Sequence, residues 1–333
     1  MKETLRYLAG IAGPSGFGSN STAEQVTEED CSRSKPSPLT AIITGATSGI
    51  GAETARVLAK RGLRVVIPAR DLKRAGEVKD RIHQENPQAE IILLKLDLNS
   101  FASIKKFCSE FLSLGLPLDI LINNAGKYCI NLEFSEDRYE MTFATNYLGH
   151  FLLTEILTEK MIETAKETGI EGRIINISSG VHSWARRERF KFNSMLNPKN
   201  YNGTEAYAQS KLAIILHTKE LAKQLEARNA RVTVNAVHPG VVNTGIASDL
   251  KGMISDSIYF IASKLLKSTA QGASTTCYVS LSSKVNGVNG KYFADCNESP
   301  CSVLANDESE AQKLWKQTQE LMHSQLTLAK TTK

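Results

Sequence analysis

The chain has 333 residues, of which 41% are apolar and 23% charged, an ordinary globular composition that excludes a disordered or fibrous chain. Its formal net charge of +5 comes from 40 basic and 35 acidic residues spread along the sequence, whereas nucleic-acid binders concentrate basic residues in a patch, so we expect no nucleic-acid partner. No apolar run reaches the roughly 18 residues of a membrane-spanning helix, and the N-terminus lacks the apolar core of a secretory signal, so we expect neither secretion nor a membrane span.

The first 37 residues are rich in Gly, Ser, Thr and Pro, and the run Lys35-Pro-Ser-Pro38 spans their end. This composition predicts a flexible N-terminal arm over residues 1–37. From Leu39 onward, short β-branched runs alternate with helical patterns, which is typical of βαβ units. Strands are expected near 39–44, 63–68, 90–96, 118–123, 172–177, 231–237 and 289–293.

This alternation predicts an α/β fold with a Rossmann-type, doubly wound parallel sheet in a single domain over residues 38–304. We find no internal repeat and no second composition class. Residues 305–333 predict one amphipathic helix followed by a polar, Lys-rich tail.

Residues 41–52 read as a strand, a Gly-rich turn and a helix start, the order that a dinucleotide phosphate needs. The glycines let the backbone approach the pyrophosphate, and the helix offers unpaired N–H groups and a positive dipole end. Glycine spacing alone is equally compatible with a plain tight turn. The cofactor-binding residues expected here are Gly45, Thr47, Ser48, Gly49, Ile50 and Gly51.

The end of the second strand is where the cofactor ribose is recognised. Arg70 there would pair with the 2′-phosphate of NADP(H), while Asp71 suits the N-cap of the next helix. Alternatively, Arg70 is a solvated surface residue and Asp71 reads the ribose of NAD(H). The sequence favours NADP(H).

The six cysteines form no Cys-x-x-Cys pair and do not alternate with histidine, so we expect free thiols in a reducing, intracellular compartment and no metal. Cys296 and Cys301 flank a proline-containing turn and would form a disulfide only if their geometry allows it.

Several motifs follow one another along the chain: Thr44-Gly-Ala-Thr-Ser-Gly-Ile-Gly51, Asn123-Asn-Ala-Gly126, Asn146, Ile177-Ser-Ser179, Tyr207-Ala-Gln-Ser-Lys211 and Pro239-Gly240. In this order and at these spacings, the chain resembles the short-chain dehydrogenase/reductase family over about residues 39 to 300. The resemblance implies an oxidoreductase that transfers hydride between NADP(H) and an alcohol or carbonyl.

Tyr207 and Lys211 are expected to be the centre of the mechanism. Tyrosine titrates near pH 10, too high for a good base at neutral pH unless its phenolate is stabilised. Lys211 lies four residues later, so both side chains project from one helix face, where an ammonium would lower the pKa of the tyrosine. The resemblance also implies that Lys211 bonds the nicotinamide ribose.

The remaining site residues are implied by the resemblance. Ser179 bonds the substrate oxygen, with Ser178 as the alternative, and Asn146 holds a water in a proton relay, with a helix-bending structural amide as its alternative. The other implied cofactor contacts are Asp97, Leu98, Asn123, Ala125, Gly126, Pro239, Gly240 and Thr244. His150, His182 and His238 lie near motifs, and we expect them to make packing or loop hydrogen bonds.

Two segments are expected to shape the substrate site. The interval from Ser179 to Tyr207 is long and contains Arg186-Arg-Glu-Arg189 with Trp184, Phe190 and Phe192. Residues 253–266 carry apolar side chains at helical spacing where the family places its substrate lid, so they favour an apolar substrate. An ordinary core-packed helix is the alternative, because the same stripe serves either purpose.

In detail, the chain looks like the branch of animal retinol dehydrogenases and plant short-chain dehydrogenases associated with the chloroplast translocon. Residues 13–24 and 271–278 lean toward the plant side, which implies a plastid or peripheral-membrane setting, with the cytoplasm as the alternative. The chain departs at Tyr147, where the branch commonly has histidine, and at Lys127, where an apolar residue is usual.

A second function is an NADP(H)-sensing interaction protein at a membrane or translocon assembly. The C-terminal helix around Leu314, Trp315, Leu321 and Met322 would dock a partner such as calmodulin, or alternatively pack on the sheet. The family also suggests a homodimer or tetramer through helices near Phe101–Leu114 and Asn146–Lys223, with a monomer as the alternative.

Overall fold

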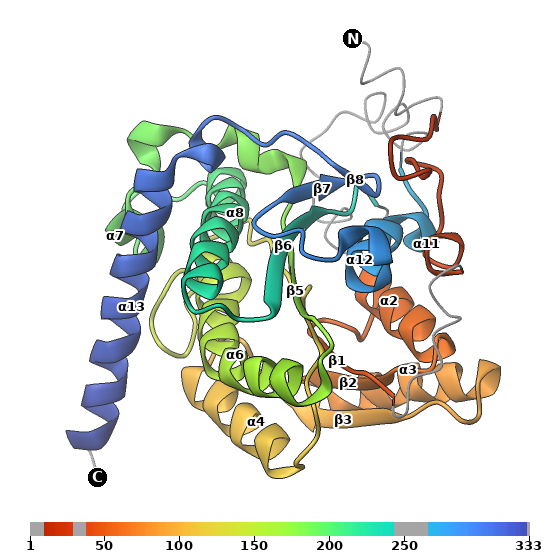
Figure 1. Cartoon of the computed structure of the whole chain (residues 1–333). Coiled ribbons are helices and arrows are strands. Elements are labelled where there is room, and N and C mark those ends of the chain that lie inside the picture. The colour runs from red at the N-terminus through yellow and green to blue at the C-terminus, as the bar shows by residue number, and fades with distance from the viewer. Residues whose placement is uncertain (1–9, 29–37, 243–265, 332–333) are drawn as a thin grey trace.

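The computed structural model describes residues 10–28, 38–242 and 266–331, and it confirms the predicted α/β, Rossmann-like fold (Figure 1). One eight-stranded sheet has the order β3-β2-β1-β4-β5-β6-β7-β8, parallel except for β8. The strands are β1 (Thr40–Ile43), β2 (Arg64–Ala69), β3 (Ile91–Lys95), β4 (Ile120–Asn123), β5 (Gly172–Ile177), β6 (Val232–His238), β7 (Tyr292–Ala294) and β8 (Asn297–Glu298). All seven predicted strands are present, and β8 is an addition.

The central strands are buried along their whole length because helices cover both faces of the sheet. The helices are α2 (Gly49–Lys60), α3 (Leu72–Glu85), α4 (Phe101–Ser113), α5 (Met141–Phe143), α6 (Gly149–Thr168), α7 (Phe192–Leu196), α8 (Gly203–Ala227), α11 (Thr269–Gly272), α12 (Ser274–Leu281) and α13 (Glu308–Thr331). One core lies under α4, α6, α8 and α13, and a second under α2, α3 and α12 (Figure 1). Within the ranges that the structure describes, none of the helices combines the length and apolarity that crossing a membrane requires.

The order of the strands determines where a ligand can bind. Strand β1 is paired with β2 on one side and with β4 on the other, so the chain reverses its direction across the sheet beside β1. In open parallel sheets, ligands bind at the carboxyl ends of the strands next to such a switch point. The Gly-rich turn after β1 and the Asn-Ala-Gly segment after β4 therefore flank the expected crevice.

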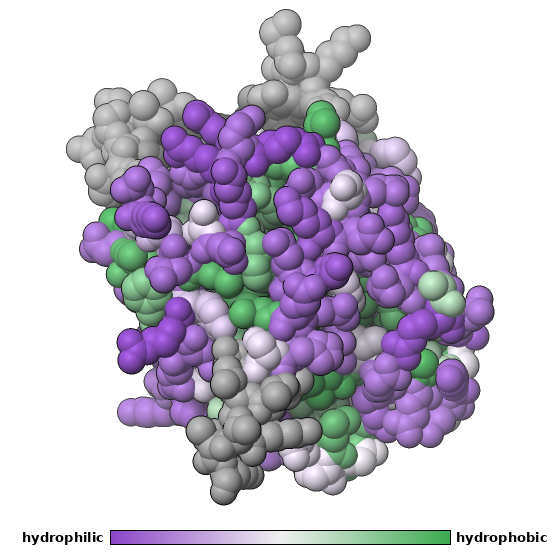
Figure 2. Space-filling view, turned by 90° about the vertical axis from the view of Figure 1, so that its left-hand side faces the viewer, coloured by the Kyte–Doolittle hydropathy of each residue, from purple (hydrophilic) through white to green (hydrophobic). Residues whose placement is uncertain are grey.

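Helix α13 packs on α8, and its apolar face is part of the first core. Trp315 stacks on His217 of α8 with ring centroids 5.4 Å apart, and it meets Phe151 of α6 edge-on. Tyr147 bonds Thr318 through its hydroxyl at 2.9 Å. Figure 2 looks onto this side of the molecule, where polar side chains predominate. The helix face predicted to dock a partner thus packs within the chain.

Residues 10–28 lie against the protein, which differs from the flexible arm that composition predicts for residues 1–37. Ala23 and Val26 are buried, and the ring of Phe17 packs edge-on against Tyr278. The backbone N–H of Ala23 donates to the carbonyl of Ala270 at 2.9 Å. The segment holds few apolar residues, so its docking depends on these scattered contacts and leaves little signal in the composition.

Glu24 fastens this segment to α2. Its carboxylate accepts hydrogen bonds from Lys60 and Arg56, both at 2.8 Å, and these bonds lower its pKa from 4.5 to about 2. A carboxyl whose pKa is depressed on folding stabilises the fold above its unfolded pKa and loses that contribution as the pH falls toward the folded pKa.

We expect Glu24→Gln to lower the free energy of unfolding by about 0.5–1 kcal/mol at pH 7, because the ion pairs are partly exposed. The difference from wild type should shrink as the pH falls from 4.5 toward 2. Urea unfolding at several pH values measures both effects, with Glu28→Gln as the control, since Glu28 is exposed and forms no ion pair within the described ranges. A deficit that persists unchanged at low pH would contradict the role of Glu24.

The five cysteines in the described part of the chain are free thiols, and Cys296 and Cys301 form no disulfide. Cys296 is buried in the turn between β7 and β8, with its backbone N–H bonded to Thr275, while Cys301 bonds Asn306. Cys31 lies outside the described residues.

Candidate active site

The Gly-rich turn after β1 has the form of a phosphate cradle. Gly45 and Gly49 have φ of +68° and +54°, which favour glycine. A Cβ on Gly51 would lie 2.4 Å from the carbonyl oxygen of Gly45, so the first turn of α2 is closely packed. Ser48 makes no side-chain cap, which leaves the first N–H groups of α2 for a ligand. The turn therefore fits a dinucleotide pyrophosphate.

Asn124 ties this turn to the end of β4, a role that sequence reasoning missed. Its side-chain amide donates to the carbonyl of Thr44 at 2.8 Å. In return, the hydroxyl of Thr44 accepts the backbone N–H groups of Asn124 and Ala125 at 2.9 and 3.0 Å. The doubled asparagine in the motif is the only signal in the sequence, and it does not say which of the two faces the turn.

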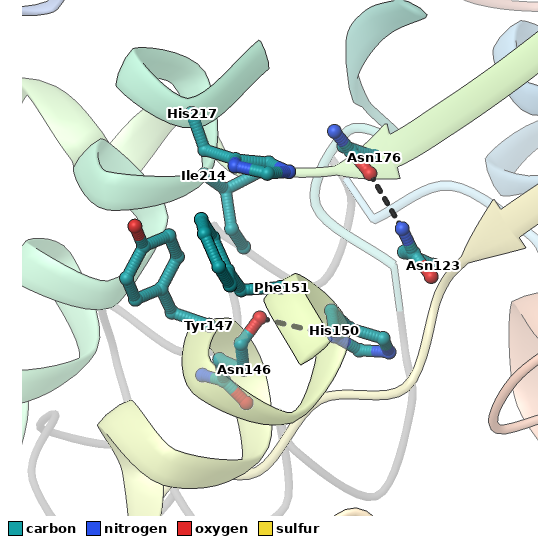
Figure 3. Close-up of a pocket in the computed structure, with 8 residues that line it drawn as sticks. All are labelled: Asn123, Asn146, Tyr147, His150, Phe151, Asn176, Ile214 and His217. Atoms are coloured by element: carbon teal, nitrogen blue, oxygen red, sulfur yellow. Dashed lines mark hydrogen bonds between the residues drawn. The ribbon is translucent and has the colours of Figure 1, made fainter. Parts of the chain in front are cut away.

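Asn123 points into the opposite side of the sheet. Its amide donates to Thr154 at 2.9 Å and to the side-chain oxygen of Asn176 at 2.8 Å, as Figure 3 shows for the second bond. Asn123 is buried, and its own side-chain oxygen has no hydrogen-bond partner within the described part of the chain. These contacts hold the end of β4 to α6 and β5, while a cofactor contact of Asn123 stays a prediction.

Arg70 is exposed at the end of β2, and Asp71 caps α3 by accepting the N–H groups of Lys73 and Arg74 at 3.0 and 3.2 Å. The Asp71 carboxylate is thus occupied by the helix, as the sequence predicts. Lys95, at the end of β3, donates to the carbonyl of Arg70. Two cations therefore lie at this edge of the sheet, and sequence reasoning missed the second one.

Asp97 lies just beyond β3. Its side chain accepts the N–H of Asn99 at 3.0 Å, and its own N–H donates to Ser103 at 2.9 Å. Leu98 is buried, and its carbonyl oxygen would lie 2.6 Å from a Cβ placed on Gly149. The loop after β3 is therefore in close contact with the start of α6.

Tyr207 and Lys211 project from one face of α8, as their spacing predicts. Lys211 is buried, and its ammonium lies 5.4 Å from the ring centroid of Tyr207 and donates to the carbonyl of Ile177 at 2.9 Å. Burial lowers the pKa of Lys211 to about 8 and raises the pKa of Tyr207 to about 12. Burial is the cause of the shift in the pKa of Tyr207, and the expected lowering by Lys211 is not found.

The two serines after β5 differ in their surroundings. Ser178 is buried, and its hydroxyl donates to the backbone carbonyl of Lys211 at 2.8 Å. Ser179 is partly exposed, and within the described residues its hydroxyl makes one long contact, a cap of 3.5 Å with the N–H of Val181. The hydroxyl of Ser178 thus joins β5 to α8 by this hydrogen bond, whereas the hydroxyl of Ser179 is accessible.

Asn146 sits in a π-helical turn, Ala144–Leu148, between α5 and α6. Its side-chain oxygen accepts the N–H of Lys127 at 2.7 Å, and its amide donates to the carbonyl of Lys127 and to the hydroxyl of Ser210, both at 3.0 Å. Both amide hydrogens are used within the protein, so the side chain clamps the loop after β4 onto α8. A relay role for Asn146 stays a prediction.

The three histidines near the motifs make the expected loop and packing hydrogen bonds. His150 bonds Asn146 and Thr44, while His182 bonds the carbonyl of Ser179 and the N–H of Ser302. His238 accepts the N–H of Gly180 at 3.2 Å. Burial lowers the pKa of all three.

Both departures from the retinol dehydrogenase-like pattern have a structural explanation. Tyr147 is buried among the rings of Phe143, Phe151 and His217 and reaches α13. Lys127 pairs with Glu133 at 2.6 Å on the loop after β4.

Pro239 and Gly240 follow β6 at the same edge of the sheet. Gly240 has φ of +88°, and a Cβ there would lie 2.7 Å from Cδ of Lys267, which is buried and pairs with Asp295. Thr244 and residues 253–265 of the expected lid lie outside the described residues.

Three exposed apolar residues lie on segments that follow strands of this edge. Trp184, Ile130 and Val241 are exposed, and they follow the ends of β5, β4 and β6 respectively. The ring of Tyr128 meets that of Tyr207 edge-on at 5.7 Å. Phe190 and Phe192, by contrast, are buried.

The motifs and the fold can be compared with those of known proteins. The family model described as short chain dehydrogenase matches residues 39–187 and 191–254. "Short-chain dehydrogenase TIC 32 B, chloroplastic" from Brassica napus is 46% identical over 315 residues, covering 94% of this chain and 96% of the relative. Retinol dehydrogenase 14 from Homo sapiens is 38% identical over 291 residues, covering 83% of this chain and 84% of the relative.

Solved structures show the same fold. An uncharacterized protein from Mycobacterium paratuberculosis superposes with a TM-score of 0.68 at 27% identity, covering 88% of this chain and 96% of that one. Actinorhodin polyketide ketoreductase with NADPH gives a TM-score of 0.61 at 25% identity, covering 81% of this chain and 98% of that one.

Proposed function

The chain belongs to the short-chain dehydrogenase family of oxidoreductases, and on this premise we propose that it is an NADP(H)-dependent enzyme that interconverts an alcohol and a carbonyl. The observation that carries the proposal is the convergence at one sheet edge of the phosphate cradle after β1, the accessible hydroxyl of Ser179 and the Tyr207–Lys211 pair of α8. A hydride carrier and a proton donor would meet there.

The residues around the Gly-rich turn fit the dinucleotide. The free N–H groups at the start of α2 would bind the pyrophosphate, and Arg70 with Lys95 would face the 2′-phosphate. Pro239 and Gly240, with Thr244, would border the nicotinamide, and Asp97, Leu98, Ala125 and Gly126 would line the adenosine side. The bound nicotinamide supplies or accepts the hydride.

In this proposal Tyr207 transfers the proton. A tyrosine hydroxyl is protonated at neutral pH, and burial raises the pKa of Tyr207 further, so the hydroxyl can donate to the carbonyl oxygen during reduction. Ser179 would hold the same oxygen by a hydrogen bond. The ammonium of Lys211, next to the tyrosine ring, would stabilise the phenolate that forms.

We propose an apolar substrate, because Trp184, Ile130 and Val241 are exposed on the segments that follow β5, β4 and β6, whose carboxyl ends form this edge of the sheet. The chloroplastic relatives support a plastid location for this chain. Titration of the protein with NADPH and NADH by fluorescence, followed by turnover with a panel of apolar aldehydes and ketones, tests the proposal. Tight NADPH binding without turnover of any of them would instead favour a nucleotide sensor.

Arg70→Gln is expected to weaken NADPH binding about 10- to 100-fold while NADH binding stays within about twofold, because only the 2′-phosphate loses a charged partner. The measurement is the Kd for each nucleotide. Arg81→Gln is the control, since Arg81 is an exposed arginine farther along α3. An equal loss for both nucleotides, or a wild type that prefers NADH, would show that Arg70 does not select the cofactor.

A further inference from the structure

His150 lies in the first turn of α6, is buried, and bonds two different parts of the candidate site. Its Nδ1 is 3.0 Å from the backbone carbonyl oxygen of Asn146, a contact drawn in Figure 3. Its Nε2 is 2.9 Å from the hydroxyl oxygen of Thr44, at the end of β1. One imidazole thus connects the π-helical turn of Asn146 to the start of the Gly-rich turn.

The partners of the ring determine where its proton lies. A carbonyl oxygen only accepts, so Nδ1 must carry the hydrogen. The hydroxyl oxygen of Thr44 already accepts the N–H groups of Asn124 and Ala125. Its own hydrogen is therefore best directed to Nε2, which is closer than its other acceptor, the carbonyl of Ile122 at 3.4 Å. His150 is then a neutral imidazole with the proton on Nδ1.

Both ends of this connection continue into the site. On one side, Thr44 holds the backbone of Asn124 and Ala125, and Asn124 in turn holds the Gly-rich turn. On the other side, Asn146 bonds Lys127 and reaches Ser210, three residues after Tyr207 on α8. A displacement of the turn can therefore reach the helix that carries Tyr207 through an unbroken series of hydrogen bonds.

We propose that His150 is a positioning residue that couples the nucleotide-binding turn to the helix bearing Tyr207. The proposal rests on the proposed function, because it assigns the turn to the nucleotide and Tyr207 to proton transfer. His150 itself touches neither the cofactor nor the reacting atoms. It acts by fixing the carbonyl of Asn146 and the hydroxyl of Thr44 relative to each other.

His217, on the neighbouring helix, provides the contrast. It is equally buried, yet among the residues that the structure describes neither of its ring nitrogens has a hydrogen-bond partner, and it stacks on Trp315. Both histidines border one small cavity of about 10 Å³, shown in Figure 3. If burial and packing alone explained the role of His150, His217 would have the same role. Coupling through hydrogen bonds, by contrast, applies to His150 and not to His217.

The test separates the two hydrogen bonds with amide variants. His150→Asn places an amide near the position of Nδ1, and His150→Gln places one near Nε2, while His150→Leu removes both. We expect His150→Leu to lose about tenfold in kcat and about tenfold in NADPH affinity. Because each amide can restore only one of the two bonds, His150→Asn and His150→Gln should both keep most of the loss in kcat and in affinity. His217→Leu, the matched control, should stay within about twofold in both.

Two measurements do not depend on turnover. Nitrogen NMR of the wild-type ring should show the Nδ1–H tautomer with and without NADPH, and the Kd values come from fluorescence titration. If the protein turned nothing over but these two results held, the proposed enzyme would fail while the connection through His150 stood. If the wild type is active and the folded variants keep both kcat and Kd, or if either amide variant by itself restores both, the coupling is overturned.

Discussion

Replacing Tyr207 with phenylalanine is expected to lower kcat about a thousandfold while NADPH affinity stays within about twofold. The change removes only the hydroxyl that transfers the proton, and the ring remains against Tyr128 and Lys211. Steady-state kinetics with an apolar aldehyde measures kcat, and fluorescence titration measures the affinity.

Tyr201→Phe is the matched control, since Tyr201 lies just ahead of the same helix and uses its hydroxyl to bond Cys129 and Glu140. It should cost about 1 kcal/mol of stability and leave kcat unchanged. A Tyr207→Phe protein with near wild-type kcat would remove Tyr207 from the chemistry. If the variant instead loses turnover but keeps a physiological role, that role is nucleotide sensing.

The substitution Gly51→Ala is expected to raise the Kd for NADPH at least about a hundredfold, because the phosphate cradle must move to admit a methyl group. The added Cβ would lie 2.4 Å from the carbonyl of Gly45 and 2.5 Å from the amide of Asn124. Because backbone cannot yield as a flexible side chain does, the free energy of unfolding should also fall by about 1–3 kcal/mol.

Gly76→Ala is the control for this prediction. Gly76 lies in α3, and a Cβ there would meet nothing within 4 Å. It should leave NADPH binding unchanged and stabilise the helix by about 0.5–1 kcal/mol. Nucleotide titration and urea unfolding of both variants give the comparison. A Gly51→Ala protein that is folded and binds NADPH normally would show that the turn is not the phosphate site.

The elements that could be predicted from the sequence are those that depend on residues close together in the chain. Buried parallel strands need apolar side chains on both faces, so all seven could be located from short apolar runs. Strand β8 could not, because the turn before it places Asp295 and Cys296 at φ of +50° and +63° without the glycine that usually marks such a hairpin. The docked segment 10–28 was missed because its contacts are few and distant in sequence.

The same distinction holds in the candidate site. The Gly-rich turn and the four-residue spacing of Tyr207 and Lys211 are local patterns, and the sequence predicts both. The hydrogen bonds of Asn124 and His150 to Thr44 join residues 80 and 106 positions apart in the sequence. A local spacing pattern therefore cannot predict them. The orientation of the Lys211 ammonium depends likewise on the tip of β5 and could not be read from α8 alone.

The position of α13 also bears on how the chain is made. Helix α8, which carries Tyr207, is synthesised about a hundred residues before α13, the helix that packs on it. Translation typically adds 5–20 residues per second. Until residues 308–324 have left the ribosome, His217 and Phe151 lack Trp315, and Tyr147 lacks its bond to Thr318. The core beside the reacting residues therefore closes last, and a nascent chain released before this point would expose that apolar surface to chaperones and proteases.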